Sequence, residues 1–444
     1  MKLGTTILVT ALCAASAVNV SEFSKPYYFH QILDHFDLNK TECFKQRYYK
    51  YDGFFREGAP IFLQIGGEVE ILGMGPNFPN ELAMKYHGFL YALEHRYYGK
   101  SVPASFSGRD PRYLSSEQAL EDIAHFIEAQ KEQYPDSPWI VSGCSYAGNL
   151  ATWMRQKYPH LVQGAIAGSA PLLVKADFYE YFEVIGEVLK GRAPLCHQNI
   201  LEANQELAML AKSPNGQRKL AKIFGVPSYS SDDSLKFHYY LAEAVLDRGV
   251  IQDLHYFKPY CSEVCYSVRR YTHEKSVLDI LVNFTMPRSQ ETSGSFVGAS
   301  LTGHAANMWL YQICHEFGYW RTLSSKKQPF GIWPNVNTLF RLDCNQWNIS
   351  METLEDNIRK TNLRYGGKTP NVTNVVFMHG SNDPWHPLGV LWDLSSSARA
   401  FVFQGLSHCE MYGGRKHFKA ADERYAEWMK IYDEIDSIVR SWIK

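Results

Sequence analysis

Three residues of the 444-residue sequence have the types and the order that nucleophilic catalysis by a serine needs: Ser145, Asp383 and His408. Ser145 lies in the segment Gly143-Cys-Ser-Tyr-Ala-Gly148, between an apolar run and a helical pattern. A strand, a sharp turn of small residues and a helix form a nucleophile elbow, in which the strained turn lifts the serine hydroxyl off the sheet edge. The usual motif is G-x-S-x-G, whereas here Ala147 takes the place of the last glycine. Taken alone, the segment also fits an ordinary tight turn before a helix.

Asp383 and His408 both follow apolar runs near the end of the chain. Asp383 comes five residues after the run at 374–378, and His408 comes five residues after the run at 400–403. Functional loops of α/β sheets lie at the carboxyl ends of strands, and a serine elbow is followed along the chain by the acid and then the histidine. Separately, Asp383 could form an Asp-Pro turn and His408 could be a surface histidine. Together, in this order, they indicate a catalytic triad.

The chemistry assigns a role to each residue. His408 would remove the proton from Ser145, while Asp383 would fix the tautomer of His408 and stabilise its imidazolium. The tetrahedral oxyanion needs two backbone donors, which we expect to be the N–H of Tyr146 and an N–H near Gly67 and Glu68. The glycine pair before Glu68 could instead be a plain turn. We expect no metal and no other cofactor.

The elements expected around these residues alternate between strands and helices. Strands are predicted at 60–65, 89–93, 138–142 and 162–167, and Ser115 begins a helix with a capping box. This alternation predicts a parallel sheet with helices on both faces. After two further strands, at 374–378 and 400–403, the chain ends in an amphipathic helix.

The alternation stops between residues 172 and 364, where helical patterns, loops and five cysteines occur. We predict that 172–364 is an inserted, mainly helical cap domain, and that 18–171 and 365–444 are the two parts of the sheet domain.

The N-terminus predicts export. Lys2 precedes an apolar run and the small residues Ala15-Ser16-Ala17, which is the pattern of a signal peptide over 1–17. The run is too short to span a bilayer, and no later stretch reaches the roughly 18 apolar residues of a membrane helix. Without Cys13, eight cysteines remain, which predicts disulfides of unknown connectivity in a secreted or lysosomal chain. Five N-x-S/T triplets fit a glycoprotein: Asn19, Asn39, Asn283, Asn348 and Asn371.

The composition is that of a folded globular protein, with 45% hydrophobic and 20% charged residues. The net charge is −1 and no basic block occurs, so a nucleic-acid partner is not expected.

Taken together, the motifs resemble those of the S28 serine peptidases over almost the whole mature chain. The shared segments are 31–36, 46–48, 94–99, 143–148, 157–161, 314–318, 365–367, 382–385 and 407–409. Segments 145–148 and 365–370 resemble the thymus-specific branch most closely. The resemblance implies an α/β-hydrolase fold with a helical cap, and hydrolysis of short peptides, often after proline.

The resemblance also implies site residues and limits. Its triad falls on Ser145, Asp383 and His408, and Trp385 and Tyr146 are the expected substrate-binding residues, although Trp385 could simply pack in the core. Cys144 stands where the family usually has glycine, and the Asp-Met-Phe segment of two other branches is missing. The sequence leaves open which peptide end is trimmed and whether the chain forms a homodimer.

Two alternatives remain at this stage. A lipase or esterase can have the same fold and triad, but its lid would be an exposed amphipathic helix rather than a long insert with cysteines. A catalytically silent binding protein would typically lack one member of the triad.

Overall fold

The core of the protein is an eight-stranded sheet. In the computed structural model, which describes residues 24–37, 39–108, 110–230, 233, 276–285, 303–331 and 335–443, the strand order is β1-β2-β4-β3-β5-β6-β9-β10. The strands are β1 (Tyr27–Ile32), β2 (Cys43–Tyr51), β3 (Ile61–Ile65), β4 (Phe89–Leu93), β5 (Trp139–Cys144), β6 (Gly164–Gly168), β9 (Val375–Gly380) and β10 (Ala398–Phe403). All neighbours from β4 to β10 pair in parallel. The predicted signal peptide lies outside the described residues.

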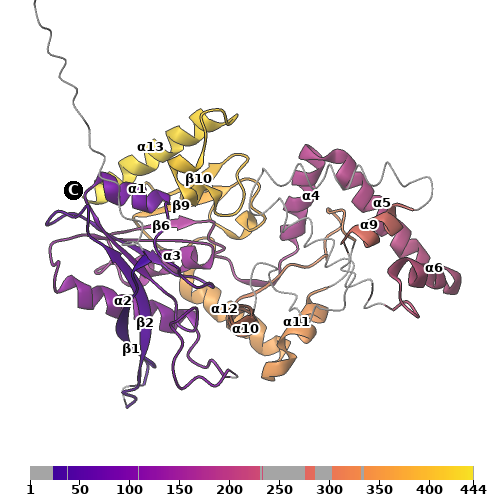
Figure 1. The fold of residues 1–444 in the computed structure, drawn as a ribbon, viewed down its shortest axis with the longest axis horizontal. Coiled ribbons are helices and arrows are strands. Elements are labelled where there is room, and N and C mark those ends of the chain that lie inside the picture. Colours follow the sequence, from indigo (N-terminus) through magenta and orange to yellow (C-terminus); the bar gives the residue numbers. More distant parts are fainter. Residues whose placement is uncertain are drawn as a thin grey trace, which may run out of the picture.

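Helices cover both faces of the sheet, as predicted, because successive strand residues point to opposite sides. Ile61 and Leu63 of β3 pack with α2 (Ser116–Lys131) and α3 (Tyr146–Lys157), whereas Phe62 packs with α1 (Phe78–Lys85) and α13 (Tyr425–Trp442). Figure 1 shows α1 and α13 on one side of the sheet and α2 and α3 on the other. The helix expected after Ser115 begins there, with the Ser115 side chain accepting a hydrogen bond from the Gln118 N–H.

The six strands predicted from the sequence are all present, with ends shifted by one or two residues. The sheet is mostly parallel, as predicted, but one edge departs from this pattern: β1 and β2 pair antiparallel, and β2 pairs antiparallel with β4. Both strands lie near the sheet edge. The first half of β2 alternates between exposed and buried residues, whereas most of β1 alternates between intermediate and exposed ones. Their lysines, arginine and glutamines hid the apolar pattern, because an edge strand needs little apolar surface.

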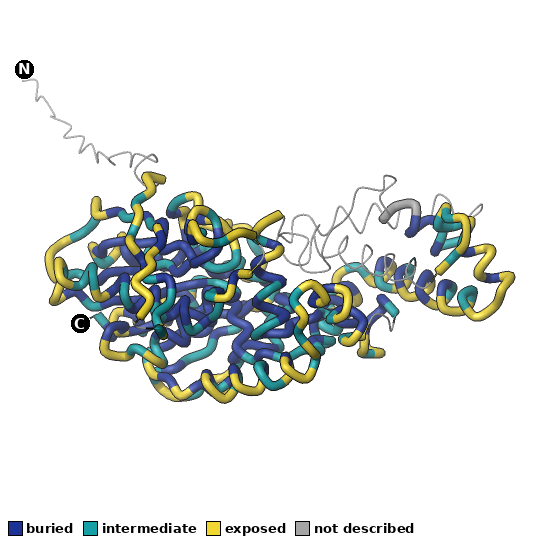
Figure 2. Tube along the Cα trace, turned by 90° about the horizontal axis from the view of Figure 1, so that it is seen from below, coloured by how far each residue is buried: buried dark blue, intermediate teal, exposed yellow. Residues whose placement is uncertain are grey.

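The chain between β6 and β9, here called the cap, is mainly helical in its described part. Its helices are α4 (Glu180–Arg192), α5 (Pro194–Leu210), α6 (Pro214–Phe224), α9 (Val277–Thr285), α10 (Gly303–Gln312), α11 (Val336–Cys344) and α12 (Met351–Tyr365). Figure 1 shows α4, α5, α6 and α9 away from the sheet, whereas α10 and α12 lie beside it. In Figure 2 the body around the sheet has a buried interior, whereas buried and exposed segments are mixed in the outlying part. The cap also contains two short paired strands that the sequence did not predict, β7 (Lys175–Asp177) and β8 (Gly318–Trp320). With three residues each, they are too short to produce an alternating pattern.

The cap is anchored to the sheet domain through a buried carboxylate. Glu316 accepts hydrogen bonds from the N–H and the hydroxyl of Ser116, at the first turn of α2. Burial raises the pKa of Glu316 to about 7, although the Ser116 bonds oppose the shift. Beside it, the rings of Tyr365 and Trp153 stack with centroids 3.9 Å apart.

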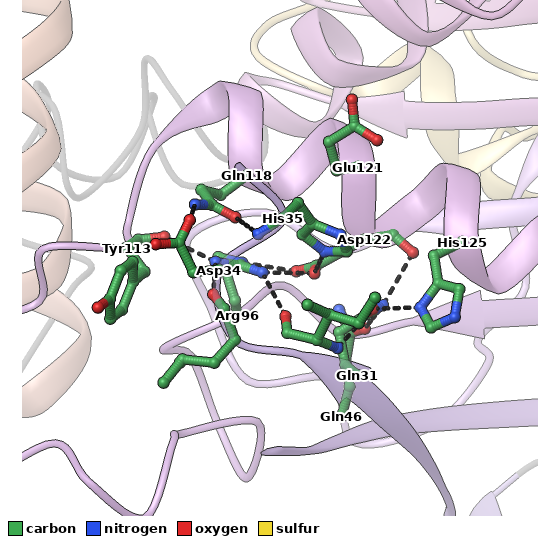
Figure 3. A network of polar contacts seen from close by, with 12 residues as sticks. Gln31, Asp34, His35, Gln46, Arg96, Tyr113, Gln118, Glu121, Asp122 and His125 are labelled. Atoms are coloured by element: carbon green, nitrogen blue, oxygen red, sulfur yellow. Dashed lines mark hydrogen bonds and ion pairs between the residues drawn. The ribbon is translucent and has the colours of Figure 1, made fainter. Parts of the chain in front are cut away.

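A second buried network joins the edge strands to α2 (Figure 3). The Arg96 guanidinium donates to both carboxylate oxygens of Asp122, at 2.7 and 2.5 Å, and both side chains are almost fully buried. His35 contacts the same carboxylate at 2.8 Å, and Gln31 donates to the Asp122 carbonyl at 2.9 Å. A buried charge needs such a partner set, since losing one partner leaves an uncompensated charge. Motif residues near 31–36 and 94–99 therefore fix the edge of the sheet.

Glu94 organises the loop that follows β3. Its carboxylate pairs with Arg47 at 2.5 Å and accepts bonds from the Ser101 hydroxyl at 2.8 Å and the Ile71 N–H at 3.0 Å. A Cβ added at Gly99, where φ is +55°, would lie 2.1 Å from this carboxylate. Only glycine fits there, which explains why Glu94 and Gly99 occur together.

The surface gives two further observations. Within the described ranges, no helix is long and apolar enough to cross a bilayer. Of the N-x-S/T asparagines, Asn39, Asn348 and Asn371 are exposed.

Candidate active site

Ser145 sits at the carboxyl end of β5, on a turn with a positive φ. Its φ is 61° and ψ is −134°, and α3 begins at the next residue. The turn is tight, because a Cβ added at Gly143 would lie 2.2 Å from the Ala147 carbonyl oxygen, and one added at Gly148 would lie 2.8 Å from the Gly168 carbonyl oxygen. This is the strained turn expected of a nucleophile elbow. Ala147 is accommodated in place of the usual glycine.

The structure brings Asp383 and His408 together. They follow β9 and β10, which pair in parallel, so the two loops leave the sheet side by side. Nδ1 of His408 lies 2.9 Å from Oδ1 of Asp383, and the Asp383 side chain is fully buried while that of His408 is 14% exposed. The same Oδ1 accepts a bond from the Trp385 N–H at 2.8 Å. Hydrogen bonding at Nδ1 leaves Nε2 of His408 as the nitrogen that can accept a proton.

The electrostatics of the pair favour a charged histidine beside a charged aspartate. Burial lowers the pKa of His408, but the charge and hydrogen bond of Asp383, with a contribution from Glu68, outweigh it and the pKa is raised. Burial raises the pKa of Asp383, but the charge and hydrogen bond of His408 reverse this and the pKa is lowered. Asp383 therefore stays ionised, and it stabilises the imidazolium that forms when His408 takes a proton.

The Glu68 side chain is a site group that sequence reasoning missed, since only its backbone was considered. Its carboxylate lies close enough to Ser145 and His408 for both to affect its pKa. Burial raises the pKa of Glu68, and its own N–H, the charge of His408 and the Ser145 hydroxyl only partly offset the rise. Its position directly after β3, at the sheet edge that carries Ser145, was the available signal.

The loop after β3 also lies against the start of α3. A Cβ added at Gly67 would lie 3.5 Å from the Ala147 nitrogen. Tyr146 is the first residue of α3, so its N–H has no acceptor within the helix. The N–H groups of Tyr146 and of the Gly67–Glu68 loop thus belong to neighbouring segments near Ser145.

The Tyr146 side chain points into the core rather than toward solvent. It is 1% exposed, and its hydroxyl lies 3.1 Å from His95 Nε2 and 3.1 Å from Gln312 Nε2. Because Gln312 belongs to α10 of the cap, this hydroxyl links the elbow helix to the cap.

Trp385 lies in an aromatic cluster that the cap completes. Its ring centroid is 5.3 Å from Phe178, 5.6 Å from Tyr181, 5.5 Å from Tyr319 and 6.1 Å from His408. Phe178, Tyr181 and Tyr319 come from the cap, while Trp385 and His408 come from the loops after β9 and β10. Trp385 remains partly exposed. Trp385 is therefore the partly exposed ring of an otherwise buried aromatic cluster, and it lies beside the candidate base.

A disulfide explains the cysteine at position 144. Cys144 is bonded to Cys409, so the residue before Ser145 is joined covalently to the residue after His408. A second disulfide joins Cys314 to Cys344 in the cap. Cys261 and Cys265 lie outside the described residues. Across the part of the chain that is described, no group of three or more histidine, cysteine, aspartate or glutamate side chains could hold a metal ion.

Comparison with known proteins agrees with this geometry. The family model of serine carboxypeptidase S28 matches residues 31–420. The chain belongs to this family. It is 32% identical to the thymus-specific serine protease of Mus musculus, covering 87% of this chain and 82% of the relative. It is 30% identical to the thymus-specific serine protease of Homo sapiens (86% and 80% covered) and 29% identical to the lysosomal Pro-X carboxypeptidase of Bos taurus (86% and 81%). This S28 protein is therefore a serine-type peptidase with an α/β-hydrolase fold and a mainly helical inserted cap, which sets aside the lipase alternative.

The charge of Glu68 gives a prediction about pH. A base must be neutral to act, and a neighbouring anion stabilises the protonated form of His408, so the acid limb of kcat/KM reports a raised pKa. Glu68→Gln removes that anion, and we expect the acid limb to move to lower pH. The measurement is kcat/KM against pH on a short peptide.

Glu70→Gln is the matched control, because Glu70 is two residues away and pairs with Arg47 instead, at 2.9 Å. Its acid limb should stay in place. An acid limb that is unchanged or moves upward in Glu68→Gln would contradict the assigned interaction.

Proposed function

We propose that this S28 peptidase trims short peptides from one end, with a preference for cleavage after proline, through an acyl-enzyme on Ser145. The observation that carries the proposal is the buried Asp383 bonded to the partly exposed His408, at the sheet edge where Ser145 occupies a strained turn. A strained, partly exposed serine beside a base that is oriented by a buried acid is the arrangement that acyl transfer requires.

In the proposed reaction His408 takes the proton of Ser145 as the hydroxyl oxygen attacks the scissile carbonyl. The N–H of Tyr146, with one from the Gly67–Glu68 loop, stabilises the oxyanion. His408 then gives its proton to the leaving amine, and the acyl-enzyme remains. A water molecule, deprotonated by His408, releases the acid product and restores Ser145. Asp383 stays ionised throughout.

The proline preference is supported by the partly exposed indole of Trp385 beside His408. A pyrrolidine ring is compact and apolar, so it gains contact area against an indole face. Trp385 is two residues from Asp383, and its N–H bonds the carboxylate that orients His408. The loop that aims the base therefore also sets the distance between the indole and the bond to be cleaved. For Tyr146 we propose a substrate contact through the backbone N–H, since its side chain is buried.

We further propose that residues 1–17 are a signal peptide, that the cap spans 172–364, and that the mature chain is secreted or lysosomal. The disulfides and the exposed N-x-S/T asparagines support an oxidising, glycosylating route. N-terminal sequencing of the chain exported by a eukaryotic host should begin near Val18, and retention of residues 1–17 would contradict the signal peptide. The homodimer stays a prediction.

Ser145→Ala tests the nucleophile. We expect the rate on a peptide substrate to fall by a factor on the order of 10⁴–10⁶ because the attacking oxygen is gone, while folding and export are unchanged. Peptides with free or blocked ends, assayed with the unmodified enzyme, show which end is trimmed. Labelling by a fluorophosphonate probe should disappear in the variant.

Ser441→Ala, an exposed serine near the C-terminus, is the control and should keep both activity and labelling. Near-normal turnover by Ser145→Ala would remove the serine from the mechanism and would favour the silent-binding alternative for this site.

Trp385→Ala tests the proline preference. Loss of the indole should cost about 1–3 kcal/mol of transition-state binding for a ring that fills the site, so kcat/KM should fall more for cleavage after proline than after alanine. Ser145 labelling should survive.

Trp392→Ala is the matched control, because Trp392 lies seven residues away and is 48% exposed. It should not change the proline-to-alanine ratio. Equal losses on both substrates in Trp385→Ala, together with lost labelling, would mean that Trp385 only supports the loop.

A further inference from the structure

The disulfide between Cys144 and Cys409 spans the two catalytic loops. It joins residues 265 positions apart in the sequence, with Cα atoms 6.0 Å apart. Cys144 precedes Ser145 and Cys409 follows His408, so one covalent bridge connects the backbone of the nucleophile to that of the base. The Sγ of Cys144 would lie 3.2 Å from a Cβ added at Gly168, so the bridge crosses the end of β6 between the two loops.

The disulfide connects two loops in which the backbone adopts an unfavourable conformation. Both Ser145 and Cys409 have a φ of 61°, and Ser169 between them has a φ of 44°. Non-glycine residues in this region are strained and persist only where their surroundings hold them. The Ser145 N–H donates to the Gly168 carbonyl at 2.9 Å, and the Cys409 N–H donates to the Ser169 hydroxyl at 3.0 Å. The disulfide is the covalent member of this set.

Noncovalent contacts also hold the loop that carries His408. Its imidazole bonds Asp383, and the Leu406 carbonyl accepts a bond from the Asn382 N–H at 2.9 Å, so these two contacts hold the loop on the side of β9. Further along the loop, the Tyr412 hydroxyl lies 3.0 Å from the Ser142 hydroxyl of β5. The Cys144 sulfur adds a covalent tie to β5 at the residue next to Ser145.

The two described disulfides differ in their access to solvent. Cys144 and Cys409 are both partly exposed, whereas Cys314 and Cys344 are both fully buried in the cap. A thiolate must reach a sulfur to open a disulfide, so exposure decides which bridge a small reductant attacks first.

We propose that the Cys144–Cys409 disulfide is a redox-sensitive clamp that positions His408 against Ser145, so that the oxidised enzyme is the active form and a thiol reductant reversibly lowers its activity. The proposal rests on the proposed triad. Cys144 and Cys409 are positioning residues in it, because they act through their neighbours and do not touch the substrate. It also gives the cysteine at the family's usual glycine position a role in catalysis.

The opening step is a thiol–disulfide exchange. A thiolate of a dithiol attacks one of the two sulfurs and forms a mixed disulfide, releasing the other cysteine as a thiolate that takes up a proton. The second thiol of the reagent then attacks the mixed disulfide and releases the remaining cysteine. The disulfide gains two electrons, the dithiol loses two and becomes a cyclic disulfide, and its two protons end on the cysteines.

The test is a dithiothreitol titration of the full exported chain after the exposed free thiol of Cys43 has been blocked with N-ethylmaleimide. Four quantities are followed: kcat and KM on a short peptide, the rate of Ser145 labelling by a fluorophosphonate, circular dichroism, and alkylation of each cysteine by peptide mapping. We expect Cys144 and Cys409 to become alkylated before Cys314 and Cys344. Over the same range kcat and the labelling rate should fall roughly 10–100-fold, the scale of a catalytic group displaced by about 1 Å. KM and the dichroism should change little, and oxidised glutathione should restore the rate.

The double variant Cys144→Ala/Cys409→Ala is the second arm. Its kcat should match that of the reduced enzyme and should not respond to dithiothreitol. Any remaining response of the variant would have to come from the other cysteines. If the variant does not fold, the reversible titration stands alone.

Several results would overturn the clamp. These are an opened Cys144–Cys409 bridge with unchanged or higher kcat and labelling, a bridge that opens only when the dichroism is lost, and a cap disulfide that opens at the same reductant concentration. Failure of the proposed triad looks different, because the oxidised enzyme itself would then not be labelled at Ser145.

Discussion

The positive φ of Ser145 is the constraint on which the site depends. A serine does not favour this backbone, and it persists here because Gly143, Gly148 and Gly168 leave room for the chain to turn so closely. The parallel pairing of β5 with β6 brings the Gly168 carbonyl to the Ser145 N–H, so the sheet itself holds the turn. The hydroxyl is thereby presented at the sheet edge where the loops after β9 and β10 carry Asp383 and His408, the proposed acid and base.

The pKa values of the two carboxyl groups near the His408 imidazole, Asp383 and Glu68, shift in opposite directions. Asp383 is fully buried, yet its pKa is lowered, because His408 and the Trp385 N–H stabilise its charge. Glu68 has a raised pKa, because burial outweighs the stabilising effects of its own N–H, His408 and Ser145. Environment rather than residue type thus shifts the pKa values of the two carboxyl groups in opposite directions. Both carboxylates favour the protonated form of His408, which in the proposed reaction gives its proton to the leaving amine.

Residues of the cap make direct contacts with the segments of the sheet domain that form the site. Gln312 holds the Tyr146 hydroxyl, Glu316 binds the start of α2, and Tyr319 lies against Trp385. These three residues are separated by only seven positions around the π-helical turn Ile313–Phe317, which ends at Gly318 with a φ of 75°. Cys314 within the same turn is bonded to Cys344. One short segment of the cap therefore links the elbow helix α3, the neighbouring helix α2 and the aromatic cluster around Trp385.

The sequence by itself determined the parallel strands, the helical insert and the order serine, aspartate, histidine, because these depend on local periodicity and on short motifs. It did not reveal β1 and β2, whose polar edge residues mask the alternation, or the short pair β7 and β8. Only the tertiary structure decided that the Glu68 side chain lies near Ser145 and His408, that Tyr146 faces the core, and that Cys144 pairs with Cys409. These facts depend on which distant segments the parallel register brings to the same sheet edge, up to 265 residues apart for Cys144 and Cys409. Local periodicity and short motifs do not encode that proximity.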